Sequence, residues 1–280
     1  LNARKMLGAN MNYDDGNSLK IDLSLRWNHR DGDLQTENAT ENFYSETTHT
    51  FSNNYTKNMT RSNNWRANLR FEWKPDSLTN ILLRANGTTG TDDGTTVSRA
   101  ATYNDDPYKY AEQPLEAFIP QITVNSNLNS SLSYSSNQNF WSMLQLYRRL
   151  NPRGRNIVLR GELSGSKGES QNASNNEVRL FQVKDRFGND STYYTARYNT
   201  TPSRSSGYVL AATYSEPLWT GAHLQFGYEL RYNQNTSDRQ TYDFSKMSQD
   251  PFNNCPLTLQ DINQIRTMLK TKMMSIYHVR

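Results

Sequence analysis

Residue types that commonly carry catalysis or bind metals are few and widely separated in this chain of 280 residues. The histidines are His29, His49, His223 and His278. They lack the close histidine or carboxylate spacings of known metal motifs. Cys255 is the only cysteine, which excludes an internal disulfide and a cysteine-based zinc site. We therefore expect no catalytic residue, no metal site and no cofactor.

Two acidic pairs are candidates for a calcium site in a loop, because hard cations prefer carboxylate ligands. They are Asp92-Asp93, which Gly94 follows, and Asp105-Asp106. Acidic residues in loops are more often solvated without a metal. Solvated loop acids are therefore the favoured interpretation of both pairs.

Five arginines stand between apolar residues and are the candidates for ligand binding: Arg66, Arg70, Arg84, Arg160 and Arg231. If their side chains line a water-filled space, they would attract anionic solutes. The alternative is that they form ion pairs with neighbouring carboxylates. The nearest of these in sequence belong to Glu72, Glu162 and Glu229. Ion pairing is the favoured alternative.

The elements that must position these arginines follow a period of two residues. Between positions 65 and 73 every second residue is apolar, in the order Trp65, Ala67, Leu69, Phe71 and Trp73. The same alternation recurs over 7–13, 19–27, 81–85, 157–163 and 224–232. Successive side chains of a strand point to opposite faces, so this pattern predicts strands with one apolar and one polar face.

Short and long connections alternate along the chain. Turn-forming Gly, Pro, Asn and Asp residues predict tight turns at 14–17, 74–77, 151–154 and 216–221. Long polar stretches, at 29–62, 87–137, 167–205 and from 234 onward, are expected to be loops. One of them contains a further predicted hairpin that turns at 188–190. The main hairpins are therefore expected at about 3–28, 63–88, 138–166 and 206–233.

Such alternating strands fit either a soluble β-sandwich or a membrane β-barrel. Hydrophobic residues make up only 34% of the chain, and no apolar run approaches the ~20 residues of a membrane helix. Barrel strands need only ~9 to 11 residues of alternating polarity. The net charge of +4 is spread along the chain rather than gathered in a block, which indicates no nucleic-acid partner.

The positions of the aromatic residues favour the barrel. Trp27, Trp65, Tyr208 and Tyr232 lie at the long-loop ends of their strands, and Tyr13, Trp73 and Tyr214 lie at the short-turn ends. Trp65 and Trp73 are eight residues apart, or about 26 Å along a strand. With a tilt of ~40° this spacing approaches the height of an apolar band flanked by aromatic girdles, ~25 Å.

Three segments resemble the TonB-dependent-receptor-like outer membrane β-barrel family of Bacteroidetes: "LRFEWKPDSLTNILLRANG", "YRRLNPRGRNIVLRGELSGS" and "YSEPLWTGAHLQFGYELRYN". The likeness rests on the aromatic-Lys-Pro-Asp-Ser-Leu-Thr turn at 73–79 and the Glu-Pro-Leu turn at 216–218, and it covers residues 1–240. It implies a large barrel, an N-terminal plug and a role in receptor-mediated uptake. It implies no catalytic residues. We recognise neither a plug nor a TonB-contacting segment in the sequence.

We therefore expect an all-β fold: a segment of a larger antiparallel transmembrane β-barrel, with about 8 membrane strands in four hairpins. Residues 1–240 would form the barrel segment. The expected partners are outer membrane lipid, the plug domain and remaining barrel strands of the same protein, and TonB through that plug. The alternative is a soluble secreted β-sandwich that binds glycan or protein.

Three further expectations follow from this fold. Leu23, Leu69 and Phe226 should face lipid, whereas Arg26, Arg70 and Glu229 should face the lumen, and the long loops should face the cell exterior. The chain is expected to be a fragment, because counting strands from the turn at 14–17 places both chain ends outside the cell. Residues 241–280 are expected to be a loop or tail, in which 259–273 show helical spacing.

Overall fold

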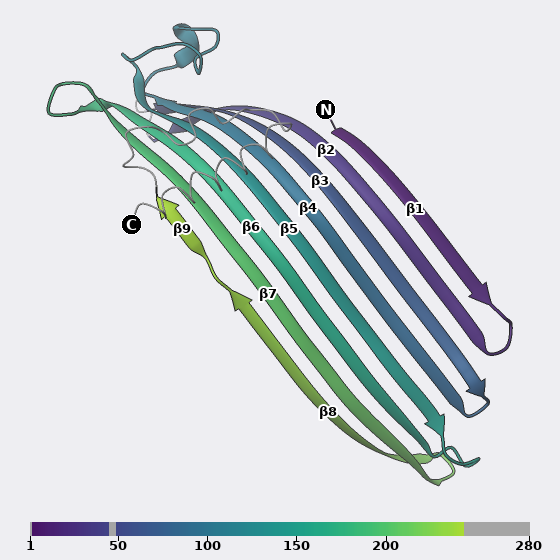
Figure 1. Ribbon diagram of the computed structural model, residues 1–280. Helices are drawn as coiled ribbons and strands as arrows, with labels where there is room; N and C mark the ends of the chain where they lie inside the picture. Colours follow the sequence, from purple (N-terminus) through teal and green to yellow (C-terminus); the bar gives the residue numbers. More distant parts are fainter. Residues whose placement is uncertain (1, 45–48, 244–280) are drawn as a thin grey trace, which may run out of the picture.

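The computed structural model describes residues 2–44 and 49–243, which form one antiparallel sheet. Its strands are β1 (Asn2–Asp14), β2 (Leu19–Phe43), β3 (His49–Asp76), β4 (Thr79–Tyr103), β5 (Thr123–Arg149), β6 (Asn156–Lys184), β7 (Asp190–Trp219), β8 (Ala222–Ser237) and β9 (Gln240–Asp243). Each strand from β1 to β8 pairs with the next, and β9 continues beside β7 beyond the end of β8 (Figure 1). Within the described residues β1 and β8 are the two edges of an open sheet and do not pair with each other. The predicted all-β, antiparallel fold is therefore confirmed.

Four tight turns lie together at one end of the sheet, where β1–β2, β3–β4, β5–β6 and β7–β8 are joined (Figure 1). In the first of them a carboxylate oxygen of Asp15 accepts backbone N–H bonds from Asn17, Ser18 and Leu19, at 2.7 to 2.9 Å. These bonds lower the pKa of the Asp15 carboxyl, and the bond from Leu19 contributes most. Gly16 adopts a φ of 72°, which a residue without Cβ reaches without strain.

The strands are far longer than the alternation of apolar residues indicates. The prediction that 29–62, 87–137 and 167–205 are loops is wrong, because β2 to β7 run through most of these residues. Connections at the far end are 104–122, which contains the short 3-10 helix η1 (Pro107–Lys109), and 185–189. The latter contains Gly188 of the predicted hairpin turn. The predicted tail helix at 259–273 and Cys255 lie outside the described residues.

The strand register places apolar residues of strands β2 to β8 on one face near the tight turns. One row across the sheet consists of Ile21, Phe71, Leu83, Leu144, Gly161, Leu210 and Leu230. The adjacent row points to the other side and consists of Asp22, Arg70, Arg84, Met143, Glu162, Val209 and Arg231. We call the side of the first row the apolar face and the side of the second the polar face.

A small core lies at the far end, not between two layers of sheet. Ala101, Tyr103, Ile119 and Ile122 are buried there and pack with Phe51, Ala111 and Leu115. The hydroxyl of Tyr103 donates to the carbonyl of Pro114 at 3.0 Å. Burial raises the pKa of Tyr103 to about 12. The segment 104–122 is therefore an ordered cap over the ends of β3 to β5.

Candidate functional site

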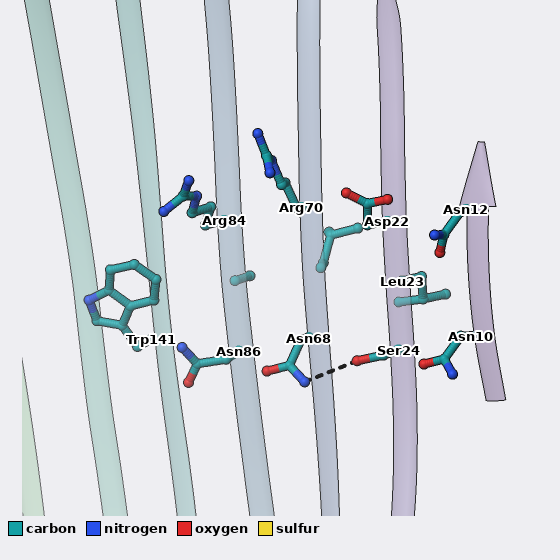
Figure 2. A pocket seen from close by; sticks show the side chains of 12 residues that line it. Asn10, Asn12, Asp22, Leu23, Ser24, Asn68, Arg70, Arg84, Asn86 and Trp141 are labelled. Carbon is teal, nitrogen blue, oxygen red and sulfur yellow. Dashed lines mark hydrogen bonds between the residues drawn. The ribbon is translucent and has the colours of Figure 1, made fainter. Parts of the chain in front are cut away.

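A hollow of about 590 Å³ lies on the polar face across β1 to β5. Its polar lining side chains are Asn10, Asn12, Asp22, Ser24, Asn68, Arg70, Arg84 and Asn86, with Trp141 at one side. Figure 2 shows Asp22, Arg70 and Arg84 in one row, and Asn10, Ser24, Asn68, Asn86 and Trp141 in the next, as the register requires. These residues come together because each strand contributes alternate positions to the same face.

Hydrogen bonds and an ion pair fix only part of this lining. The amide of Asn68 donates to the hydroxyl of Ser24 at 3.0 Å (Figure 2). The guanidinium of Arg70 lies 3.0 Å from Glu72, whose carboxylate also lies 3.3 Å from the ammonium of Lys74. Glu72 is therefore shared between two cations. Neither Arg84 nor Asp22 forms an ion pair with another described residue.

The sequence-derived candidates all lie on the polar face, but the hollow contains only Arg70 and Arg84. Arg160 lies 3.3 Å from Glu162 and 2.9 Å from Glu229, which in turn lies 2.9 Å from Arg231. The predicted ion pairing is confirmed for Arg70, Arg160 and Arg231. It is not found for Arg84 and Arg66 among the described residues.

The register also brings arginines together, which sequence reasoning missed. Arg26 is directly opposite Arg66, and Arg70 is directly opposite Arg84. Trp141 was missed as well, because Phe140 and Trp141 are neighbours in sequence and only the pairing of Asn86 with Trp141 assigns the tryptophan to the polar face. The spacing of arginines along one strand is visible in the sequence, but their partners across strands are not.

The acidic pairs considered for calcium are not arranged for it. Asp92 and Asp93 lie on β4 rather than in a loop. Their side chains therefore point to opposite faces of the sheet and cannot bind one ion together. Asp105 accepts from the ammonium of Lys109 at 2.9 Å, and this bond is the main cause of the lowered pKa of its carboxyl. Among the residues the structure describes, no three His, Cys, Asp or Glu side chains gather into a potential metal site.

The described histidines stand apart from one another. His29 lies between Asn63, at 2.7 Å, and Asp31, at 2.8 Å. His49 lies 2.8 Å from Glu41, and His223 is on β8. His278 lies outside the described residues. In the part of the chain that the structure describes, no helix is long and apolar enough to cross a membrane.

A second hollow, of about 420 Å³, lies at the far end between the cap 104–122 and strands β4 to β6. The guanidinium of Arg179 lies 5.7 Å from the ring centre of Phe118 and 5.2 Å from that of Phe181. It also pairs with Asp190 at 3.3 Å. Arg179 is therefore already paired within the protein. The second hollow offers less unpaired charge than the hollow on the polar face.

No protein-family model matches the chain, and no curated protein matches it either. Among solved structures, the siderophore receptor PiuA from Acinetobacter baumannii is 9% identical, with a TM-score of 0.17 over 84% of this chain and 45% of the receptor. The membrane pore complex of pneumolysin is 9% identical, with a TM-score of 0.11 over 94% of this chain and 36% of that one. The transport unit of the autotransporter AIDA-I from Escherichia coli is 7% identical, with a TM-score of 0.10 over 84% of this chain and 88% of that one.

The chain thus spans less than half the length of the siderophore receptor it is compared with. TM-scores this low do not establish a shared fold.

Proposed function

We propose that this chain forms part of the wall of an outer membrane β-barrel in a TonB-dependent-receptor-like protein that takes up a ligand across the outer membrane. The observation that carries the proposal is the exposure of the apolar face. Leu163 and Phe226 are each 59% exposed, and Leu210 is 53% exposed. Soluble proteins rarely expose a continuous apolar surface of more than a few hundred Å². A lipid bilayer is the environment in which such a face is stable.

The apolar band runs obliquely across the strands, as it does in a barrel with tilted strands. Trp27 and Trp65 mark the border of the band on β2 and β3, and their row across the sheet reaches β7 at Arg204. The aromatic residue that marks the border on β7 is Tyr208, which lies four residues closer to the tight turns. Four residues span about 13 Å along a strand. The aromatic residues of β2 and β3 lie four to six strand spacings from those of β7 and β8, which is roughly 19–29 Å across the sheet. The band is therefore inclined by roughly 25–35°, close to the tilt of ~35–45° in membrane barrels.

Aromatic side chains lie at the border of this band, where barrels carry their girdles. The rings of Trp27 and Trp65 are 6.2 Å apart, and those of Tyr208 and Tyr232 are 5.4 Å apart. Beyond these pairs both faces are rich in Asn, Ser and Thr. We infer that the far halves of the strands stand outside the membrane.

The alternative is a soluble β-sandwich that binds glycan or protein. A sandwich would cover the apolar face with a second sheet. The described residues form one sheet, so the cover would have to come from elsewhere. This alternative predicts a protein that needs no detergent.

Fractionation of cells that express the full-length protein tests the proposal. We expect the protein in the outer membrane fraction, resistant to extraction by high salt and alkaline carbonate, and released by detergent. A peripheral outer membrane protein that salt extracts serves as the control. Recovery of the protein in the aqueous fraction without detergent would favour the sandwich and refute the barrel.

A further inference from the structure

The polar face brings four arginines together on three neighbouring strands. Arg26 of β2 is opposite Arg66 of β3, and Arg70 of β3 is opposite Arg84 of β4. Arg66 and Arg70 are four residues apart, so their side chains leave the same face. Like charges directly opposite each other destabilise a sheet. A nearby negative charge would offset the repulsion within these two arginine pairs.

The described residues supply little of that charge. Glu72 pairs with Arg70, but it also pairs with Lys74. Asp22 is opposite Arg70 in the register and lines the same hollow, yet among the described residues Arg70 pairs with Glu72 and Asp22 forms no ion pair. Arg26, Arg66 and Arg84 likewise form no ion pair in the described part of the chain, where the nearby pairs are those of Arg70, Arg160 and Arg231. The hollow therefore keeps an excess of positive charge.

We propose that this hollow binds an oxyanion, a carboxylate or phosphate group, between Arg70 and Arg84, with the remainder of the solute against Trp141. The inference rests on the proposed function, in which the polar face lines the water-filled side of the wall. A guanidinium binds carboxylate and phosphate through two parallel hydrogen bonds. Low-dielectric walls increase the attraction that such cations exert on an anion.

The neighbouring side chains indicate the kind of molecule that carries the oxyanion. Asn68 and Asn86 lie in the next row and offer amide groups that both donate and accept hydrogen bonds. Trp141 presents a large aromatic surface beside Asn86 (Figure 2). The expected ligand is therefore a small organic anion with a flat or apolar part, in preference to a bare inorganic ion.

Calorimetric titration of the purified full-length protein in detergent tests the proposal with two probes, phenyl phosphate and inorganic phosphate. We expect phenyl phosphate to bind more tightly than inorganic phosphate. Arg84→Gln should weaken the binding of phenyl phosphate at least 10-fold. Trp141→Leu should abolish the advantage of phenyl phosphate over inorganic phosphate.

Arg231→Gln is the matched control, because it removes the same charge from the same face at a residue already paired with Glu229. It should change binding less than 2-fold. If Arg84→Gln does not fold, Arg84→Lys keeps the charge without the planar fork and should still weaken binding measurably.

Three results would overturn the proposal: no binding of phenyl phosphate by the unaltered protein, unchanged binding in the Arg84 variant, or an equal loss in the Arg231 control. The first is expected if an acidic protein segment already occupies the hollow. These failures differ from failure of the proposed function. A protein that stays membrane-embedded but does not bind phenyl phosphate loses only this inference, whereas a detergent-independent protein loses the barrel.

Discussion

At the scale of single residues, neighbours in sequence meet opposite environments. Leu210 lies on the apolar face between Gly161 and Leu230, whereas Val209 lies on the polar face between Glu162 and Arg231. The same substitution at the two positions should therefore have very different consequences. The difference depends on lipid, because both side chains would be hydrated if both faces met water.

An arginine introduced at each of these positions measures that difference. Leu210→Arg places a charge near the middle of the apolar band and should destabilise the membrane-inserted protein by ~2–4 kcal/mol. Val209→Arg, the control, should cost at most about 1 kcal/mol, because its charge meets water and the attraction of Glu162 on one side offsets the repulsion from Arg231 on the other. The measurement is reversible denaturant unfolding in lipid vesicles. Equal costs at the two positions would contradict the assignment of the faces.

Tyr103 gives the far-end cap a dependence on pH. Its pKa is raised by burial to about 12 from a usual value of 10.0, so the folded cap binds the phenolic proton more tightly than the unfolded chain. The stability from this burial is complete below pH 10 and is lost as pH rises toward 12. The protection of 104–122 against hydrogen exchange, normalised to the intrinsic base-catalysed rate, should fall over that interval, and Tyr103→Phe should abolish the fall. An unchanged pH profile in the variant would show that other groups are responsible.

Each of the long strands β2 to β7 has two unlike halves. Near the tight turns the strands carry an apolar and a polar face, and beyond the aromatic pairs both faces are polar. The interstrand pairing continues without interruption, for example from Leu69 opposite Leu23 to Asn53 opposite Ala39. We infer that the far halves extend the wall on the extracellular side.

The sequence predicts the near halves and misses the far ones for a physical reason. Alternation reveals a strand only when its two faces meet different environments, as at 65–73. In β5, residues 129–139 read "NSSLSYSSNQN" and contain only Leu132 and Tyr134 as large non-polar residues, too few to show an alternation. Backbone hydrogen bonds hold such a strand whatever its side chains. The site was predicted in part for a similar reason: alternation assigns Arg70 and Arg84 to one face, but only the register shows that they are opposite each other.

Epitope insertion tests the orientation of the elements. A tag between Glu112 and Gln113, in the cap, should be labelled by antibody on intact cells. A tag at Ser77, in the tight turn between β3 and β4, should be labelled only after the outer membrane is opened. The reason is that membrane barrels carry short turns on the periplasmic side. Labelling of the Ser77 tag alone on intact cells would reverse the orientation.

At the scale of the whole molecule, the two sheet edges are the main consequence of placing this chain in a membrane. The outer sides of β1 and β8 have no strand partner among the described residues, and β9 pairs with β7 rather than with either edge strand. In hydrocarbon each unsatisfied backbone group costs several kcal/mol. A barrel wall therefore requires both edges to pair, either with each other or with further strands.

Spin labels at each position from 65 to 73 in β3 show whether one face of the sheet meets lipid and the other meets water. The full-length protein is reconstituted in bilayers, and the access of oxygen and of a water-soluble nickel chelate is measured. Oxygen access should peak at positions 67, 69 and 71, and nickel access at positions 66, 68, 70 and 72. In a soluble sandwich the apolar positions would be shielded from both reagents. Shielding of that kind, or equal nickel access at Leu69 and Arg70, would show that the apolar face does not meet lipid.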